Sequence, residues 1–244
     1  MPLVGSVPEK CWQVIVVTAE AYDPEWPDGT KDDDKRPPAK LSAWYRDSDS
    51  ANNNRQWQQY GETVDAVVGW NGVGPGNDDT GKTPLGSYAL GQTFGRKDRP
   101  DISFGNYFTA GEQDYWDTGW KWRQREIAGC EPLLPPSRYN EHFRAVKDPH
   151  DDNDDLETES LDQDAYNLAV FVDHNPTKRP GWGCAIFLHC DDQSRTWGCI
   201  TIDEGVLSNL LPWLKTEAEP HLTVLVSPVD AEIKSPLIEC PPPE

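Results

Sequence analysis

The chain has 244 residues, and its 42 acidic and 22 basic side chains give it a formal charge of −20 at pH 7. A surface this acidic repels nucleic acid and anionic lipid, so neither is an expected partner. No apolar run approaches the roughly 18 residues of a membrane span, and the first residues lack the basic and long apolar segments of a standard secretory signal. With 36% hydrophobic residues and 11 tryptophans, the chain can nevertheless build a substantial core.

Strand patterns dominate the chain. Short segments rich in β-branched and aromatic residues, bounded by Gly, Pro, Asn or Asp, are typical of β-strands. They cover residues 11–19, 41–47, 62–70, 86–95, 166–175, 184–190 and 221–227. In residues 204–215 the apolar positions recur at helical spacing instead, and we expect Pro212 to end or kink this short helix. We therefore predict an all-β fold, mainly β with one or two short helices, in a single domain that covers residues 1–244.

Two acidic stretches, residues 29–40 and 148–164, are expected to be solvated loops. The second also approximates a calcium-binding loop that begins at Asp151. That loop, however, requires glycine where Leu156 stands and a bidentate glutamate where Asp162 stands. Calcium is therefore the minor alternative for this stretch.

Residues 76–83, GNDDTGKT, match the phosphate-binding loop of nucleotide hydrolases letter for letter. Such a loop must lead directly into a helix whose first amides hold the phosphates. Here Pro84 favours an extended Thr83, and a strand pattern comes next in the chain. Asp78 and Asp79 would also place negative charge in the phosphate cradle. We expect no nucleotide site.

The most informative segment covers residues 181–203 and contains Trp-Gly-Cys twice, at Cys184 and Cys199, with His189 and Cys190 between them. The cysteines could bind a metal, provide a nucleophile or only pack. In a strand the side chains alternate, so His189 points away from Cys184 and Cys190, and no Cys-x-x-Cys pair is present. Zinc is therefore the weaker interpretation, and we expect neither a metal site nor another cofactor.

For the nucleophile interpretation, His189 ends a strand, and Cys199 begins the next apolar run after a nine-residue connection. A hairpin could bring the two side by side, and a neighbouring imidazole would promote the thiolate. Gly198 allows a tight turn whose backbone amides could face a developing oxyanion. The alternative is a packed histidine beside an inert buried cysteine, and the pattern alone does not separate the two.

Several blocks of the chain resemble one family. Residues 185–202, AIFLHCDDQSRTWGCITI, resemble the catalytic segment of the L,D-transpeptidases (YkuD-like domains), in which a strand ends in His and a later Ser/Thr-x-Gly-Cys carries the nucleophile. Residues 81–90, GKTPLGSYAL, resemble the family's Thr-Pro-x-Gly-x-Tyr/Phe segment. Residues 137–140 and 166–176 resemble further blocks of a subgroup with long inserts. The resemblance is strongest over residues 63–226.

This resemblance implies a YkuD-like β-sandwich or barrel with a His/Cys hairpin site. It implies that Cys199 is the nucleophile, His189 its base and Gly198 part of the oxyanion site, whereas Cys184 occupies a position of strand packing. The candidate substrate-binding residues are Arg195, Thr196, Trp197, Tyr139, Asn140 and Tyr166. This chain departs from many relatives at Trp197, where they carry a second His, and at Thr201, where they carry Arg or Asn.

The implied function is that of a peptidoglycan L,D-transpeptidase. The cysteine attacks a stem peptide, releases the terminal D-Ala and passes the acyl group to an amine or to water. The expected partners are peptidoglycan stem peptides, and the expected location is extracytoplasmic. Three alternatives remain: a secreted L,D-carboxypeptidase or exchange toxin of the same chemistry, with an immunity protein as its partner; a catalytically dead peptidoglycan-binding module; and a zinc-stabilised structural protein.

Overall fold

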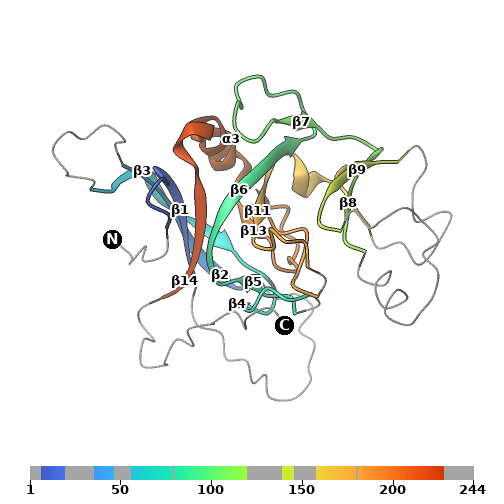
Figure 1. Ribbon diagram of the computed structural model, residues 1–244, viewed down its shortest axis with the longest axis horizontal. Coiled ribbons are helices and arrows are strands. Elements are labelled where there is room, and N and C mark those ends of the chain that lie inside the picture. The colour runs from blue at the N-terminus through green and yellow to red at the C-terminus, as the bar shows by residue number, and fades with distance from the viewer. Residues whose placement is uncertain are drawn as a thin grey trace, which may run out of the picture.

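The computed structural model describes residues 7–19, 36–46, 56–78, 80–119, 139–145, 158–179 and 181–227, and it is mainly β (Figure 1). One sheet of nine strands dominates it, in the order β11-β12-β13-β3-β2-β1-β14-β6-β7. An additional pairing of β11 with β6 closes this sheet on itself. Its strands are β1 (Gln13–Ala19), β2 (Pro38–Tyr45), β3 (Gln58–Val67), β6 (Gly86–Gly95), β7 (Phe108–Thr109), β11 (Ala169–Asp173), β12 (Phe187–Cys190), β13 (Ile200–Ile202) and β14 (His221–Val226).

Two smaller sheets accompany the main one. A three-stranded sheet has the order β10-β8-β9, and a two-stranded parallel pair joins β4 to β5. Trp116 of β8 packs against Phe171 and Phe187, with ring centroids 4.7 and 5.0 Å apart, so the three-stranded sheet is anchored to β11 and β12. These short strands are β4 (Val73–Gly74), β5 (Thr83–Pro84), β8 (Asp114–Asp117), β9 (His142–Arg144) and β10 (Thr158–Ser160).

The core follows from side-chain alternation along the strands. In β1, Ile15 and Val17 face the main apolar cluster, while Val14 and Val16 belong to a separate cluster on the other face. The helix α3 (Glu204–Trp213) adds the buried side chains of Leu207, Leu210 and Leu211 to the main cluster. Its first turn is capped by Asp203, whose carboxylate accepts a hydrogen bond from the amide of Val206 at 3.1 Å.

The strands and the helix agree with the sequence-based expectation. Each of the predicted strands is present within a few residues of its expected bounds, and α3 ends one residue after Pro212. The short strands β4, β5 and β7 to β10 were not predicted, because stretches of two to four residues carry no readable alternation. No helix in the described ranges is both long and apolar enough to cross a membrane.

The expected hairpin between His189 and Cys199 is wrong. β12 and β13 pair in parallel, with His189 opposite Thr201, so the connection has to cross back to the start of β12. Parallel neighbours ordinarily need a longer crossover than this one. Cys199 consequently lies level with Phe187, whose amide is 3.4 Å from its sulfur, and His189 lies further along the strand.

The chain after residues 76–83 excludes the phosphate-loop interpretation of that motif. Thr83 and Pro84 form β5, the amide of Leu85 bonds to the carbonyl of Gly74 at 2.9 Å, and β6 begins at Gly86. A strand therefore stands where a phosphate-binding loop needs a helix.

Most of the two acidic stretches, including the start of the calcium-like loop at Asp151, lies outside the described residues. The described ends of these stretches form β-strands rather than the expected loops. Residues 38–40 belong to β2, and residues 158–160 form β10. Asp162 forms an ion pair with Arg96 at 3.0 Å.

Candidate active site

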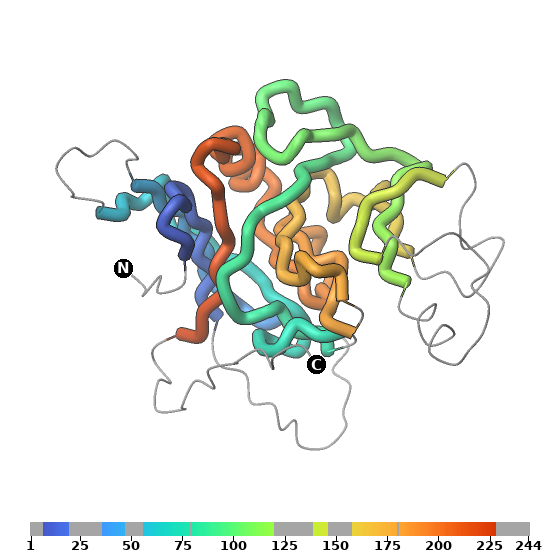
Figure 2. The backbone as a smooth tube through the Cα atoms, viewed as in Figure 1, coloured from blue at the N-terminus to red at the C-terminus, as the bar shows by residue number. Residues whose placement is uncertain are grey.

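A cavity of about 550 Å³ lies where β12, the start of β13 and β10 meet the 3-10 helix η1 (Asp164–Tyr166). Both His189 and Cys199 line it. The chain around residues 76–85 forms another part of the wall, and Figure 2 shows this teal segment beside the orange segment that leads into β12. Other side chains in the wall include Lys82, Glu159, Tyr166, Cys184, Arg195, Thr196 and Trp197.

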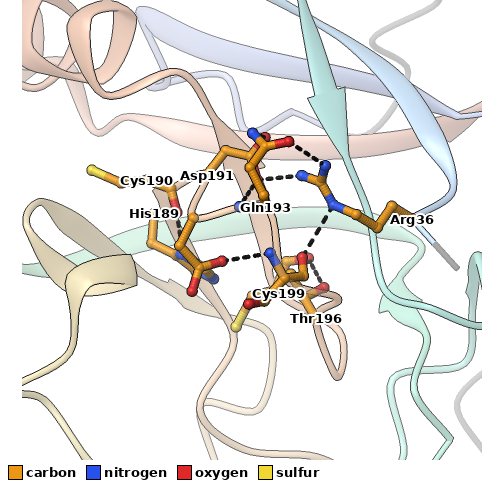
Figure 3. Close-up of polar contacts among 9 residues, drawn as sticks. Arg36, His189, Cys190, Asp191, Gln193, Thr196 and Cys199 are labelled. Atoms are coloured by element: carbon orange, nitrogen blue, oxygen red, sulfur yellow. Dashed lines mark hydrogen bonds and ion pairs between the residues drawn. The ribbon is translucent and has the colours of Figure 1, made fainter. Parts of the chain in front are cut away.

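His189 is a buried imidazole, and one carbonyl contact indicates which of its ring nitrogens carries the hydrogen. Its Nδ1 lies 2.9 Å from the carbonyl oxygen of Cys190, and because a carbonyl only accepts, this contact favours the tautomer with the hydrogen on Nδ1 and the lone pair on Nε2 (Figure 3). Burial lowers the pKa of His189, and the carbonyls of Cys190 and Ala165 offset only part of that effect. The ring of Tyr166 packs edge-on against the imidazole at 5.1 Å.

Cys199 is a buried, neutral thiol. Its sulfur donates to the carbonyl of Ala185 at 3.3 Å and accepts from the amide of Phe187 at 3.4 Å. Burial raises its pKa well above the ordinary value, and the nearby carboxyl of Glu159 raises it further, whereas only the Phe187 amide lowers it. Within the described residues no hydrogen bond joins this thiol to His189, so the site rests as thiol and imidazole rather than as an ion pair.

The turn before Cys199 requires glycine. Gly198 has a φ of +139°, and a Cβ there would lie 2.9 Å from both the carbonyl oxygen of Lys82 and a methyl of Ile186. Thr83 donates to the Gly198 carbonyl and accepts from the amide of Gly69, both at 2.8 Å. The Thr-Pro segment is therefore bonded directly to the turn that carries the cysteine.

Thr196 and Arg36 hold the connection between His189 and Cys199. The Thr196 hydroxyl donates to the carbonyl of Cys199 at 2.8 Å. Arg36, which the sequence did not single out, forms an ion pair with Asp191 and donates to the Gln193 side chain at 2.9 Å (Figure 3). These bonds hold the short connection in place between the two parallel strands.

An aromatic rim borders the cavity. Trp197 is 61% exposed, and its ring meets Trp70 edge-on with centroids 5.9 Å apart. The guanidinium of Arg195 lies 5.5 Å from the Trp70 ring and 5.9 Å from the Trp197 ring, within the range of cation–π attraction. A ligand entering the cavity therefore meets a cation and an open indole face.

Tyr139 and Asn140, two further candidates, are buried outside the cavity lining. The side-chain oxygen of Asn140 accepts from the amide of Ala185 and from the indole of Trp116, both at 3.0 Å. The Tyr139 hydroxyl donates to the carboxylate of Asp78, which itself lines the cavity. Both residues support the wall from behind.

The cysteines do not converge on one point. Cys184 lines the cavity with Cys199, but Cys190 packs in the main core with its sulfur 3.6 Å from the carbonyl of Leu168, and burial raises its pKa to about 11. All the cysteines in the described ranges are free thiols. Those ranges also contain no cluster of three or more His, Cys, Asp or Glu side chains able to hold a metal ion.

We expect the alkylation of Cys199 by iodoacetamide to be slow at pH 7 and to rise about tenfold per pH unit to beyond pH 9, because only the thiolate reacts and the pKa of this thiol is raised. Mass spectrometry of the peptide that contains Cys199 measures the rate. A rate that levels off below about pH 8 would contradict the neutral pair and indicate a thiolate–imidazolium pair.

No family model, no curated protein and no solved structure matches this chain.

Proposed function

We propose that the protein is a cysteine acyltransferase of the L,D-transpeptidase type that acts on peptidoglycan stem peptides. The scissile bond joins the L-centre of a diamino acid to the terminal D-Ala. The proposal also implies an extracytoplasmic location, where this substrate is found.

In the first half-reaction, the Sγ proton of Cys199 moves to Nε2 of His189 and the sulfur attacks the peptide carbonyl. The backbone amides of Gly198 and Cys199 hold the oxyanion. As the C–N bond breaks, His189 returns the proton to the leaving nitrogen, so D-Ala departs as an amine and a thioester remains. The thiol must first exchange its hydrogen bond with Ala185 for one with His189.

In the second half-reaction, an amine of another stem attacks the thioester, and His189 accepts its proton and passes it to the departing sulfur. The product is a cross-linked peptide. If water attacks instead, the product is a shortened stem, and the reaction is that of an L,D-carboxypeptidase. A toxin of this chemistry would use the same residues.

One observation supports the proposal: His189 and Cys199 share a cavity, and the contact of Nδ1 with the carbonyl of Cys190 favours Nε2 of His189 as the basic nitrogen. Lys82 and Arg195, the two basic residues of the wall, offer binding sites for the carboxylates of a stem peptide. Removal of a proton by a positioned base raises a reaction rate by about 10² to 10⁴. A neutral thiol depends on this contribution more than a preformed thiolate does.

A second candidate is a peptidoglycan-binding module that performs no acyl transfer. The burial and raised pKa of Cys199, and its hydrogen bond to Ala185 rather than to His189, favour this interpretation. In that case the cavity and the exposed Trp197 would serve binding alone.

Incubation with a tetrapeptide stem that ends in L-Lys-D-Ala should release free D-Ala, measured by liquid chromatography and mass spectrometry. The same peptide ending in L-Lys-L-Ala is the matched control and should remain intact, because the proposed site reads the configuration of the leaving residue. Binding of the first peptide without release of D-Ala would support the binding module instead.

A further inference from the structure

One carboxyl group of the cavity has no part in the acyl transfer. Glu159 is the middle residue of β10, paired with Trp116 of β8, and it lines the cavity together with Cys199. The hydroxyl of Tyr166 donates a hydrogen bond to Oε1 of Glu159, which leaves Oε2 for a ligand. Glu159 lies close enough to Cys199 for its negative charge to raise the pKa of that thiol.

Among the residues that the structure describes, no counter-charge acts on this carboxyl group. Burial raises the pKa of Glu159 to about 7, and the hydrogen bond from Tyr166 lowers it by a smaller amount. In the described part of the chain no cation lowers this pKa. The titratable groups that face it are Tyr166, Cys199 and Cys184, and all three have raised pKa values and are neutral at pH 7. A desolvated carboxylate without a counter-charge is costly, and a cationic ligand group removes that cost.

We propose that Glu159 binds a primary ammonium group of the substrate, so that the cavity selects stem peptides whose diamino residue keeps a free side-chain amine. This inference rests on the proposed function and names the residue that sets its substrate class. A stem in which that amine is blocked or absent is then a poor donor.

The geometry favours an ammonium over other cations. One available oxygen suits a compact point charge, whereas a guanidinium binds a carboxylate through two parallel hydrogen bonds and needs both oxygens. A metal ion needs several protein ligands, and the described residues supply no such cluster around Glu159.

Ammonium binding also acts on the nucleophile. In the free protein an ionised Glu159 disfavours the Cys199 thiolate. A bound ammonium cancels that charge, so the correct substrate removes one of the effects that keep the thiol protonated. Selection and activation are thereby coupled through one carboxylate.

The test uses the Cys199→Ala protein, in which no turnover occurs, and two tetrapeptides, L-Ala-γ-D-Glu-L-Lys-D-Ala and its norleucine analogue, which lacks only the ammonium. Calorimetry at about pH 8, where Glu159 is ionised, should show the lysine peptide binding about tenfold more tightly. Adding Glu159→Gln should abolish this preference without changing the affinity for the norleucine peptide.

The pH dependence supplies a second readout. Because the carboxyl group is ionised above pH 7, the preference for lysine should be largest there and should shrink as the pH falls toward 5. Asp192→Asn is the matched control, since it removes another carboxylate of the same wall and should leave the preference intact.

Equal affinities for the two peptides, or a preference that survives Glu159→Gln, would overturn the inference. Release of D-Ala from both peptides at equal rates by the unmodified protein would leave the acyl transfer standing and reject the role of Glu159. A Glu159-dependent preference without any release of D-Ala would support the role of Glu159 in binding and reject the acyl transfer.

Discussion

Replacing Cys199 with alanine should abolish the covalent adduct that a carbapenem forms with this protein. The resemblance to L,D-transpeptidases implies that the thiol opens the lactam ring and retains it as an acyl group, and alanine carries no nucleophile. Intact-mass spectrometry should therefore show one added carbapenem on the unmodified protein and none on the variant, a loss of at least about 10³ in labelling rate.

The matched control is Cys190→Ala. Cys190 packs in the main core and does not line the cavity, so its removal should leave the adduct in place. Labelling that persists in Cys199→Ala would move the nucleophile elsewhere, with Cys184 the next candidate in the wall. Absence of any adduct on the unmodified protein would favour the binding module.

Much of the fold could be predicted because long strands carry a readable signal. β1 and β6 are dense in β-branched or aromatic residues and bounded by chain breakers, and the Val14/Ile15 alternation assigns two faces directly. The family resemblance implied a sandwich or barrel, but the strand patterns did not indicate that β11 pairs with β6 to close the sheet. Strand order depends on contacts between segments far apart in the chain, which periodicity does not report.

The candidate site was predictable only where its residues share one segment. His189 and Cys199 stand close together in the sequence, and the cavity does contain both. Their parallel pairing was missed because a short connection ordinarily indicates an antiparallel hairpin, and Arg36, whose bonds hold the crossover, lies far away in the chain.

Glu159 was missed for a different reason. It belongs to an acidic stretch, in which each carboxylate has the same solvated appearance, and only the pairing of β10 with β8 places this one inside the cavity. The Thr-Pro resemblance was more informative, since Thr83 bonds to the carbonyl of Gly198. That contact joins two segments that lie far apart in the sequence.

Replacing His189 with glutamine should lower the rate of carbapenem acylation by about 10³, within the usual range for loss of a general base. Glutamine keeps a polar side chain of similar length, so the fold should persist, but its amide does not accept a proton at neutral pH. Because the Cys199 thiol has a raised pKa, no preformed thiolate replaces the lost base. Stopped incubation followed by intact-mass spectrometry measures the rate.

The residual acylation of His189→Gln should rise steadily with pH, since hydroxide then has to remove the thiol proton. His221→Gln is the control, because this histidine on β14 does not line the cavity and its loss should leave the rate unchanged. An unchanged rate in His189→Gln would mean that the imidazole only packs against Tyr166. The thiol would then have to be activated by another cavity group, and among the described residues Glu159, whose pKa burial raises to about 7, is the first candidate.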